Sequence, residues 1–179
     1  MSFAFLRSLL AGPIPVDPTV DWPAADGTTP VVSLEARQIG PLKFGGTLEE
    51  ARRFGRPDSC RFIQPDYLEL VYGPAGFQMD FEKNLLVYAA FFIAPDEFQP
   101  PIKTLRHCAP RERGGARFSA WTTKEDFIRA LGQPDSTDAA DADDIIINYC
   151  RNGLMLEFEL NKTGHLKRWN LFPEENTSP

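Results

Sequence analysis

The sequence is poor in the residues that carry metal, redox and acid–base chemistry, with only 3 cysteines and 2 histidines. Cys60, Cys108 and Cys150 are an odd set without Cys-x-x-Cys spacing, which argues against a disulfide framework and favours reduced thiols. His107 neighbours Cys108, but adjacent side chains of an extended chain point apart, which argues against a nucleophilic pair. We therefore expect no metal, no cofactor and no catalytic residues.

Two further absences limit the partners and the location. The formal net charge of −6 lacks the basic surplus that is usual in nucleic-acid-binding proteins. No stretch reaches the roughly 18 consecutive apolar residues of a transmembrane helix. Residues 1–10 are apolar but short, and Arg7 interrupts them where a secretion signal would be continuous. We expect a cytoplasmic protein that binds neither nucleic acid nor a membrane.

What the sequence does contain is one module written twice. Residues 47–54 and 123–131 are each predicted to form a short helix. Each begins at a threonine that is followed three residues later by an acid, as in a capping box. Each runs into a Gly-x-Pro-Asp turn that ends a helix, at Gly55 and Gly132. These glycines lie 77 positions apart, and this constant offset indicates an internal duplication.

Paired strands follow each predicted helix, after a polar loop. Residues 67–72 and 77–82 alternate apolar and polar side chains around a glycine-containing turn, which predicts a β-hairpin. Residues 144–149 and 154–159 repeat this pattern at the same offset. One more strand is predicted after each hairpin, at 85–93 and 166–172.

These elements predict an α+β fold. It consists of two tandem repeats of short helices plus antiparallel strands, with the helices packed on one face of the sheet or sheets. The predicted organisation is an N-terminal arm (1–30), repeat 1 (31–94), a linker (95–115), repeat 2 (116–174) and a tail (175–179).

The module resembles the repeat shared by the β-lactamase inhibitor proteins (BLIP) and the BamE (SmpA/OmlA) outer-membrane assembly lipoproteins. The resemblance implies a scaffold in which two modules form one long curved sheet that grips a partner protein. It is carried by capping and packing residues and therefore implies a fold rather than an active site. These residues are 131–135, Tyr149 and Phe158 in the second copy and, less well matched, 54–58, Tyr72 and Phe81 in the first.

The two copies differ most on the second face of the hairpins. In the first copy this face carries Tyr67, Tyr88 and Phe92, aromatic residues of the kind that anchor protein interfaces. Arg111 and Arg113 add basic groups in the linker. We predict that these five residues bind a partner. The alternative is that the apolar N-terminal arm folds over the aromatic patch and buries it.

An acidic run between residues 135 and 144 lacks the Asp-x-Asp-x-Asp-Gly order of a calcium loop, and we interpret it as a solvated loop. The predicted function is a non-enzymatic protein-binding module, an inhibitor or a toxin-immunity protein that acts by rigid-surface recognition. The alternative is a small-molecule-binding protein or enzyme with a site in the cleft between the two repeats. A homodimer without any other partner is the third hypothesis.

Overall fold

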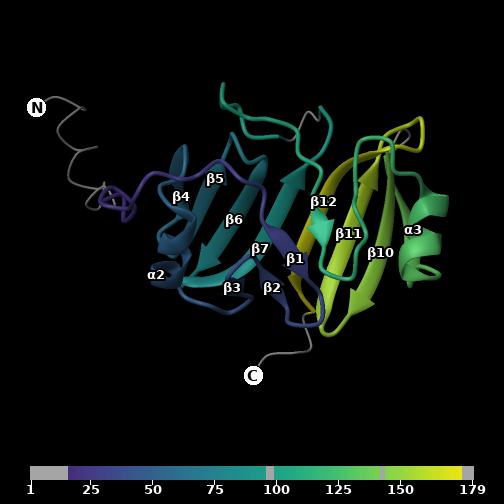
Figure 1. Cartoon of the computed structure of the whole chain (residues 1–179), viewed down its shortest axis with the longest axis horizontal. Coiled ribbons are helices and arrows are strands. Elements are labelled where there is room, and N and C mark those ends of the chain that lie inside the picture. The colour runs from purple at the N-terminus through teal and green to yellow at the C-terminus, as the bar shows by residue number, and fades with distance from the viewer. Residues whose placement is uncertain (1–15, 96–98, 142–143, 175–179) are drawn as a thin grey trace, which may run out of the picture.

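The computed structural model describes residues 16–95, 99–141 and 144–174, and its main feature is a large antiparallel sheet (Figure 1). This main sheet has eight strands in the order β4-β5-β6-β7-β12-β11-β10-β9. The strands are β4 (Ser59–Gln64), β5 (Tyr67–Tyr72), β6 (Phe77–Glu82), β7 (Leu85–Phe92), β9 (Ser136–Asp141), β10 (Asp144–Arg151), β11 (Leu154–Leu160) and β12 (Leu166–Pro173).

A second, smaller sheet lies over one face of the main sheet (Figure 1). Its four strands are short and follow the order β3-β2-β1-β8, with β8 parallel to β1. They are β1 (Val31–Ser33), β2 (Gln38–Ile39), β3 (Leu42–Lys43) and β8 (Arg111–Glu112). The helical elements of the described chain are α2 (Leu48–Ala51), the 3-10 turn η1 (Arg52–Phe54) and α3 (Lys124–Leu131).

Both helices begin at the predicted capping boxes, which are confirmed. The Glu50 carboxylate accepts the Thr47 N–H at 2.7 Å, and the Asp126 carboxylate accepts the Thr123 N–H at 3.0 Å. These acids satisfy free amides at the positive end of each helix. Even so, α2 has four residues and α3 has eight, which is too short for either to form a layer of its own.

The prediction of an α+β fold with helices packed on a sheet is wrong, because the chain is mostly β. The segments after each helix, interpreted as polar loops, form the outermost strands β4 and β9 of the main sheet. Their polar side chains suit an edge strand, which water reaches on one side. The acidic run is likewise mostly strand, since residues 136–141 belong to β9. The α+β architecture implied by the BLIP/BamE resemblance is corrected in the same way.

The predicted hairpins are confirmed in position and register. Tyr67 lies opposite Glu82 and Tyr72 opposite Phe77, while Ile147 lies opposite Phe158 in the second hairpin. Alternation along these strands sends one set of large side chains into a common core. The largest of them are Tyr72, Phe77, Phe81, Tyr149 and Phe158, and they pack in one core with Phe91 of β7, Trp169 of β12, Phe127 of α3 and Phe118.

The residues that the sequence repeats make the same contact in each half. The hydroxyl of Tyr72 donates to the Gly55 carbonyl at 3.1 Å, and that of Tyr149 donates to the Gly132 carbonyl at 3.0 Å. Each bond ties the end of a helix to the adjacent hairpin. The repeated residues therefore have a structural role in each half.

The two halves meet where β7 pairs antiparallel with β12, a contact that we call the seam. Ala90 lies opposite Asn170, and Phe92 lies opposite Arg168. Because the last strand of each half is the one that pairs, the strand order is the same when counted from either edge. This is the arrangement of an isologous, two-fold contact.

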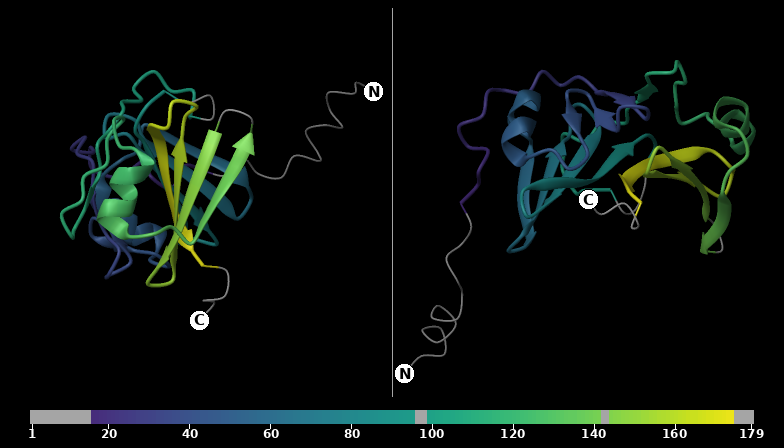
Figure 2. Two further views of the ribbon diagram at one scale, coloured as in Figure 1. Left: turned by 90° about the vertical axis from the view of Figure 1, so that its right-hand side faces the viewer. Right: turned by 90° about the horizontal axis from the view of Figure 1, so that it is seen from below.

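The face of the main sheet that points away from α2, α3 and the small sheet is the open face. Figure 2 shows the sheet bent, with its outer strands curving toward the side of this face. Among the described residues no helix and no second sheet lies over it (Figure 2).

Candidate functional site: the open face of the sheet

A row of polar side chains crosses the open face at the seam. The Tyr88 hydroxyl donates to Oδ1 of Asn170 at 2.9 Å. Nδ2 of Asn170 donates to Glu157 at 2.7 Å and to Glu159 at 2.6 Å, and Arg168 donates to Glu159 at 2.7 Å. The row links β7, β12 and β11. Because its members are hydrogen-bonded to one another, they are held in one arrangement.

A second polar cluster lies on β4, β5 and β6. Arg61 pairs with Glu69 through an Nη2–Oε1 distance of 2.9 Å. Asp80, which is 6% exposed, accepts hydrogen bonds from the Tyr67 hydroxyl at 2.9 Å and from the Gln78 amide at 2.8 Å. The period-2 alternation of β5 and β6 places these groups on the open face while Leu68, Leu70 and Met79 enter the core.

Burial raises the pKa of Asp80 to about 6. The hydrogen bonds from Gln78 and Tyr67 oppose this shift, and the nearby Glu69 carboxylate adds to it. The buried carboxylate is therefore ionised at neutral pH at a cost in free energy. Burial and the neighbouring Asp80 also raise the pKa of Tyr67, so its hydroxyl remains a donor.

A cavity of about 350 Å³ lies between the two clusters and opens on this face. Its floor comes from β4 to β7, Arg168 of β12 borders it across the seam, and residues 99–101 form one lip. Tyr88 and Phe92 supply aromatic wall, and Asp80 supplies a carboxylate. We call it the seam cavity.

The three predicted aromatic residues share the open face but do not form an exposed patch. Phe92 is 2% exposed, and Tyr67 and Tyr88 are half-buried and hydrogen-bonded through their hydroxyls. They act as walls and donors of the two polar clusters. The proposed cover by the N-terminal arm concerns residues 3–16, of which all but Val16 lie outside the described residues.

The two predicted arginines lie elsewhere. Arg111 belongs to β8 of the small sheet, on the opposite side of the main sheet, and the Arg113 N–H donates to the Val32 carbonyl at 2.8 Å. Both side chains are exposed. The structure therefore does not bring Arg111 and Arg113 together with the aromatic residues.

Sequence reasoning missed the most exposed aromatic residue of the described chain. Trp121 is 80% exposed and lies edge-on to the His165 ring at 5.9 Å, near the start of α3. Trp121 stands two positions before the helix cap Thr123 and outside every segment with a regular apolar pattern. A large aromatic residue in such a position is the sequence signal that could have identified it. An exposed tryptophan is itself a candidate interface residue.

The cysteine and histidine side chains form no reactive pair. Sγ of Cys108 donates to the Gly76 carbonyl at 3.2 Å, and burial raises the pKa of this thiol to about 12. His107 is exposed, and its ring lies 3.4 Å from Gln99. Within the described ranges, no three His, Cys, Asp or Glu residues are grouped to hold a metal ion. No helix there is long and apolar enough to cross a membrane.

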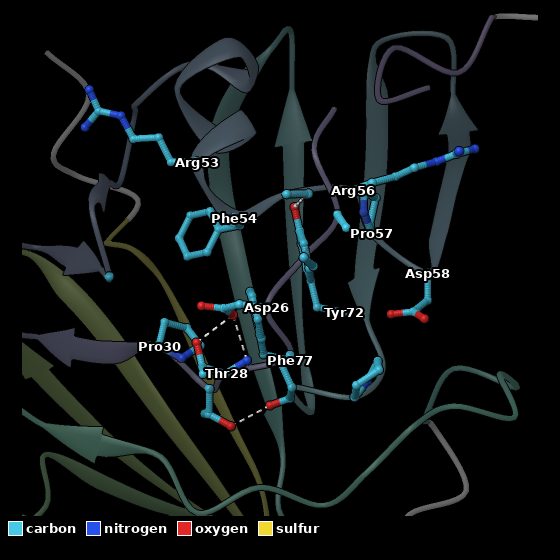
Figure 3. A pocket seen from close by; sticks show the side chains of 18 of the residues that line it. Asp26, Thr28, Pro30, Arg53, Phe54, Arg56, Pro57, Asp58, Tyr72 and Phe77 are labelled. Atoms are coloured by element: carbon cyan, nitrogen blue, oxygen red, sulfur yellow. Dashed lines mark hydrogen bonds between the residues drawn. The ribbon is translucent and has the colours of Figure 1, made fainter. Parts of the chain in front are cut away.

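A larger pocket lies on the other side of the main sheet, between residues 23–31 and the turn at 53–58 (Figure 3). Its volume of about 870 Å³ suits a small molecule. Phe54, Tyr72 and Phe77 form its inner wall, with the Tyr72 and Phe77 rings stacked at 4.6 Å. We call it the rear pocket.

The mouth of the rear pocket is polar. The Asp26 carboxylate accepts the Thr28 N–H at 2.8 Å and fixes a turn in the wall (Figure 3). Arg53 lies at the rim, is exposed, and takes part in no ion pair within the described ranges. The pocket thus combines an aromatic wall with two arginines, Arg53 and Arg56, of which Arg56 pairs with Asp17 at 3.9 Å.

No family model and no curated protein matches the sequence. Among solved structures, the fold is similar to a DUF4309 family protein (YjgB) from Bacillus subtilis, with 16% identity and a TM-score of 0.49 over 74% of this chain and 82% of that one. It is also similar to an extracellular protein containing an SCP domain from Bacillus anthracis, with 11% identity and a TM-score of 0.47 over 74% of this chain and 44% of that one. The resemblance to the BLIP and BamE repeat stays a prediction.

Proposed function

We propose that the chain is a non-enzymatic protein-binding module that holds its partner on the open face of the main sheet, as an inhibitor or immunity protein does. The observation that carries this proposal is the polar row across the seam, in which Tyr88, Asn170 and Glu159 are fixed on a face that no described helix or second sheet covers. We also propose a cytoplasmic location, supported by the free thiols of all three cysteines.

The preformed row favours binding for an entropic reason. Side chains that are already held by hydrogen bonds lose little rotamer freedom when a partner arrives, so less of the contact energy is lost to ordering. The charged groups around the row then select the partner by electrostatic complementarity. Nothing in this mechanism needs a reactive side chain.

Site-specific photo-crosslinking tests this proposal. A benzophenone amino acid is incorporated in place of Met155, whose alternation with buried Leu154 and Leu156 places it on the open face. The matched control carries the same group in place of the exposed Trp121 on the other side. The proposal predicts a crosslinked partner from position 155 and none from position 121; the reverse result overturns it.

A second candidate function is small-molecule binding in the rear pocket (Figure 3). It is favoured by the stacked wall of Tyr72 and Phe77 and by the unpaired Arg53 at the rim, a combination suited to a flat molecule with an acidic group. A thermal-shift screen of aromatic carboxylates on the wild type and on Arg53→Gln tests it. A shift that Arg53→Gln abolishes supports the pocket, and the absence of any shift removes this candidate.

A further inference from the structure

We propose that the seam cavity receives a cationic side chain, lysine or arginine, of the partner protein. This inference rests on the proposed function, because it names the chemistry by which the open face recognises its partner. It depends on three features of the cavity: the balance of charge around it, the state of the Asp80 carboxylate, and the aromatic wall.

Four charged side chains line the cavity, the cations Arg61 and Arg168 and the acids Glu69 and Asp80. Arg61 pairs with Glu69 at 2.9 Å, while Glu159 pairs with Arg168 at 2.7 Å and with Lys167 at 3.7 Å. Asp80 takes part in no ion pair among the described residues, and its two hydrogen-bond donors are the neutral side chains of Tyr67 and Gln78. The group that lacks a partner of opposite sign is therefore a carboxylate.

The carboxylate of Asp80 is prepared for such a partner. Asp80 is only 6% exposed, so folding has already removed most of the water that would hydrate its carboxylate. A cation that enters the cavity therefore forms a charge-assisted hydrogen bond without having to dehydrate the acid again. A carboxylate offers about four acceptor sites, and Tyr67 and Gln78 occupy two of them.

The aromatic wall adds a second attraction. Tyr88 and Phe92 line the same cavity as Asp80, and the face of an aromatic ring attracts a desolvated cation. The volume of about 350 Å³ suits the end of one long side chain rather than a whole domain element. Glu157, which accepts from Asn170 beside the cavity, contributes further negative charge.

The repulsion expected from Arg61 and Arg168 is reduced by their own acids. Each guanidinium lies within 3 Å of a carboxylate oxygen. An anionic ligand competes with these acids for the guanidinium groups, whereas a cationic ligand does not. The cavity therefore favours a cation over an anion.

Titration with Nα-acetyl-L-arginine amide, followed by two-dimensional NMR of the full chain, tests the proposal. The matched control ligand is Nα-acetyl-L-citrulline amide, which has the same shape but no charge. We expect saturable shifts of the backbone amides around Tyr88 with the arginine probe and none with the citrulline probe. Equal shifts with both probes, or no saturable shift with arginine up to its solubility limit, overturn the proposal.

Two variants locate the effect. Asp80→Asn keeps the shape of the side chain and should weaken the arginine probe by at least about tenfold. Glu125→Gln removes an exposed acid of α3, away from both cavities, and should leave the affinity unchanged. Wild-type affinity in Asp80→Asn contradicts the assignment. Because the citrulline comparison uses the wild type, the test remains decisive even if Asp80→Asn fails to fold.

The outcomes separate the cavity from the wider function. If the arginine probe binds at Asp80 while no partner crosslinks from position 155, the proposed function fails and the cation site stands. If the partner crosslinks from position 155 while both probes behave alike, the function stands and the cation site fails.

Discussion

The hydroxyl of Tyr88 donates a hydrogen bond of 2.9 Å to Oδ1 of Asn170, across the pair of strands that joins the two halves of the sheet. Asn170 is 3% exposed, and its side-chain amide donates hydrogen bonds to Glu157 and Glu159 of β11. Hydrogen bonds therefore join the two halves on the open face of the seam, while the rings of Phe91 and Trp169 stack at 5.4 Å on the core face.

Tyr88→Phe tests how much the hydrogen bond between Tyr88 and Asn170 stabilises the fold. The variant keeps the ring, which lies 6.4 Å from Phe172, but leaves Oδ1 of buried Asn170 without its donor. We expect a loss of about 1–2 kcal/mol in the free energy of unfolding. Urea denaturation measures it, with the m-value unchanged. If Tyr88→Phe is as stable as the wild type, the hydrogen bond between Tyr88 and Asn170 does not stabilise the seam.

The glycines that end the two helices form a matched pair. Gly55 and Gly132 have φ of 79° and 85°, so alanine is strained at both positions. At Gly55 a Cβ atom would also lie 2.6 Å from the backbone of Ala25, whereas at Gly132 nothing lies within 4 Å. We therefore expect Gly55→Ala to lower the melting temperature more than Gly132→Ala does. Equal losses would show that residues 23–25 do not pack on this turn.

The pKa of Asp80 predicts how stability depends on pH. The folded carboxyl, with a pKa of about 6, binds its proton more tightly than the unfolded one, whose pKa is 3.8. Between these values the folded state holds more protons, so this group stabilises the fold at low pH, and its contribution is lost as pH rises through 6. Two pKa units correspond to about 3 kcal/mol.

Asp80→Asn isolates this contribution from other titrating groups. The amide keeps an acceptor and a donor for Tyr67 and Gln78 but carries no charge. Relative to the wild type, we expect the variant to gain up to about 3 kcal/mol of stability on going from pH 4 to pH 7. Urea melts of both proteins at the two pH values give the difference, and a difference that does not change with pH contradicts the account.

Two cysteines are expected to be chemically inert in the folded chain. Burial raises the pKa of both Cys60 and Cys108 to about 12, so each is a thiol rather than a thiolate at pH 8. Alkylation by iodoacetamide, followed by peptide mass spectrometry, should label both slowly in the folded protein and rapidly in urea. Fast labelling of folded Cys108 would mean that its thiol is activated, contrary to the site as described.

The sequence predicted the parts of the fold that depend on neighbours along the chain. The Thr47 and Thr123 caps and both hairpins follow from local spacing and alternation. Strand β9 was missed because its side chains lack an apolar alternation, and β4 was missed because its alternation is limited to Cys60 and Phe62. Pairing with β10 and β5 makes these segments strands. The two-residue strand β8 likewise exists only through its contact with β1.

The candidate site shows the same division. Alternation correctly placed Tyr67, Tyr88 and Phe92 on one face of the sheet. It could not reveal that Tyr88 meets Asn170, because that contact depends on the register between the last strands of the two halves. Nor could it place Arg111, whose position follows from the pairing of β8 in the other sheet.

The dissociation constant of the partner complex, measured by calorimetry for two variants, tests the central proposal most directly. Met155→Arg puts a long charged side chain on the open face, and Trp121→Ala removes the exposed aromatic residue on the other side. We predict that Met155→Arg weakens binding at least about tenfold, or ~1.4 kcal/mol, while Trp121→Ala leaves it unchanged. Weakened binding in Trp121→Ala with wild-type affinity in Met155→Arg would contradict binding on the open face.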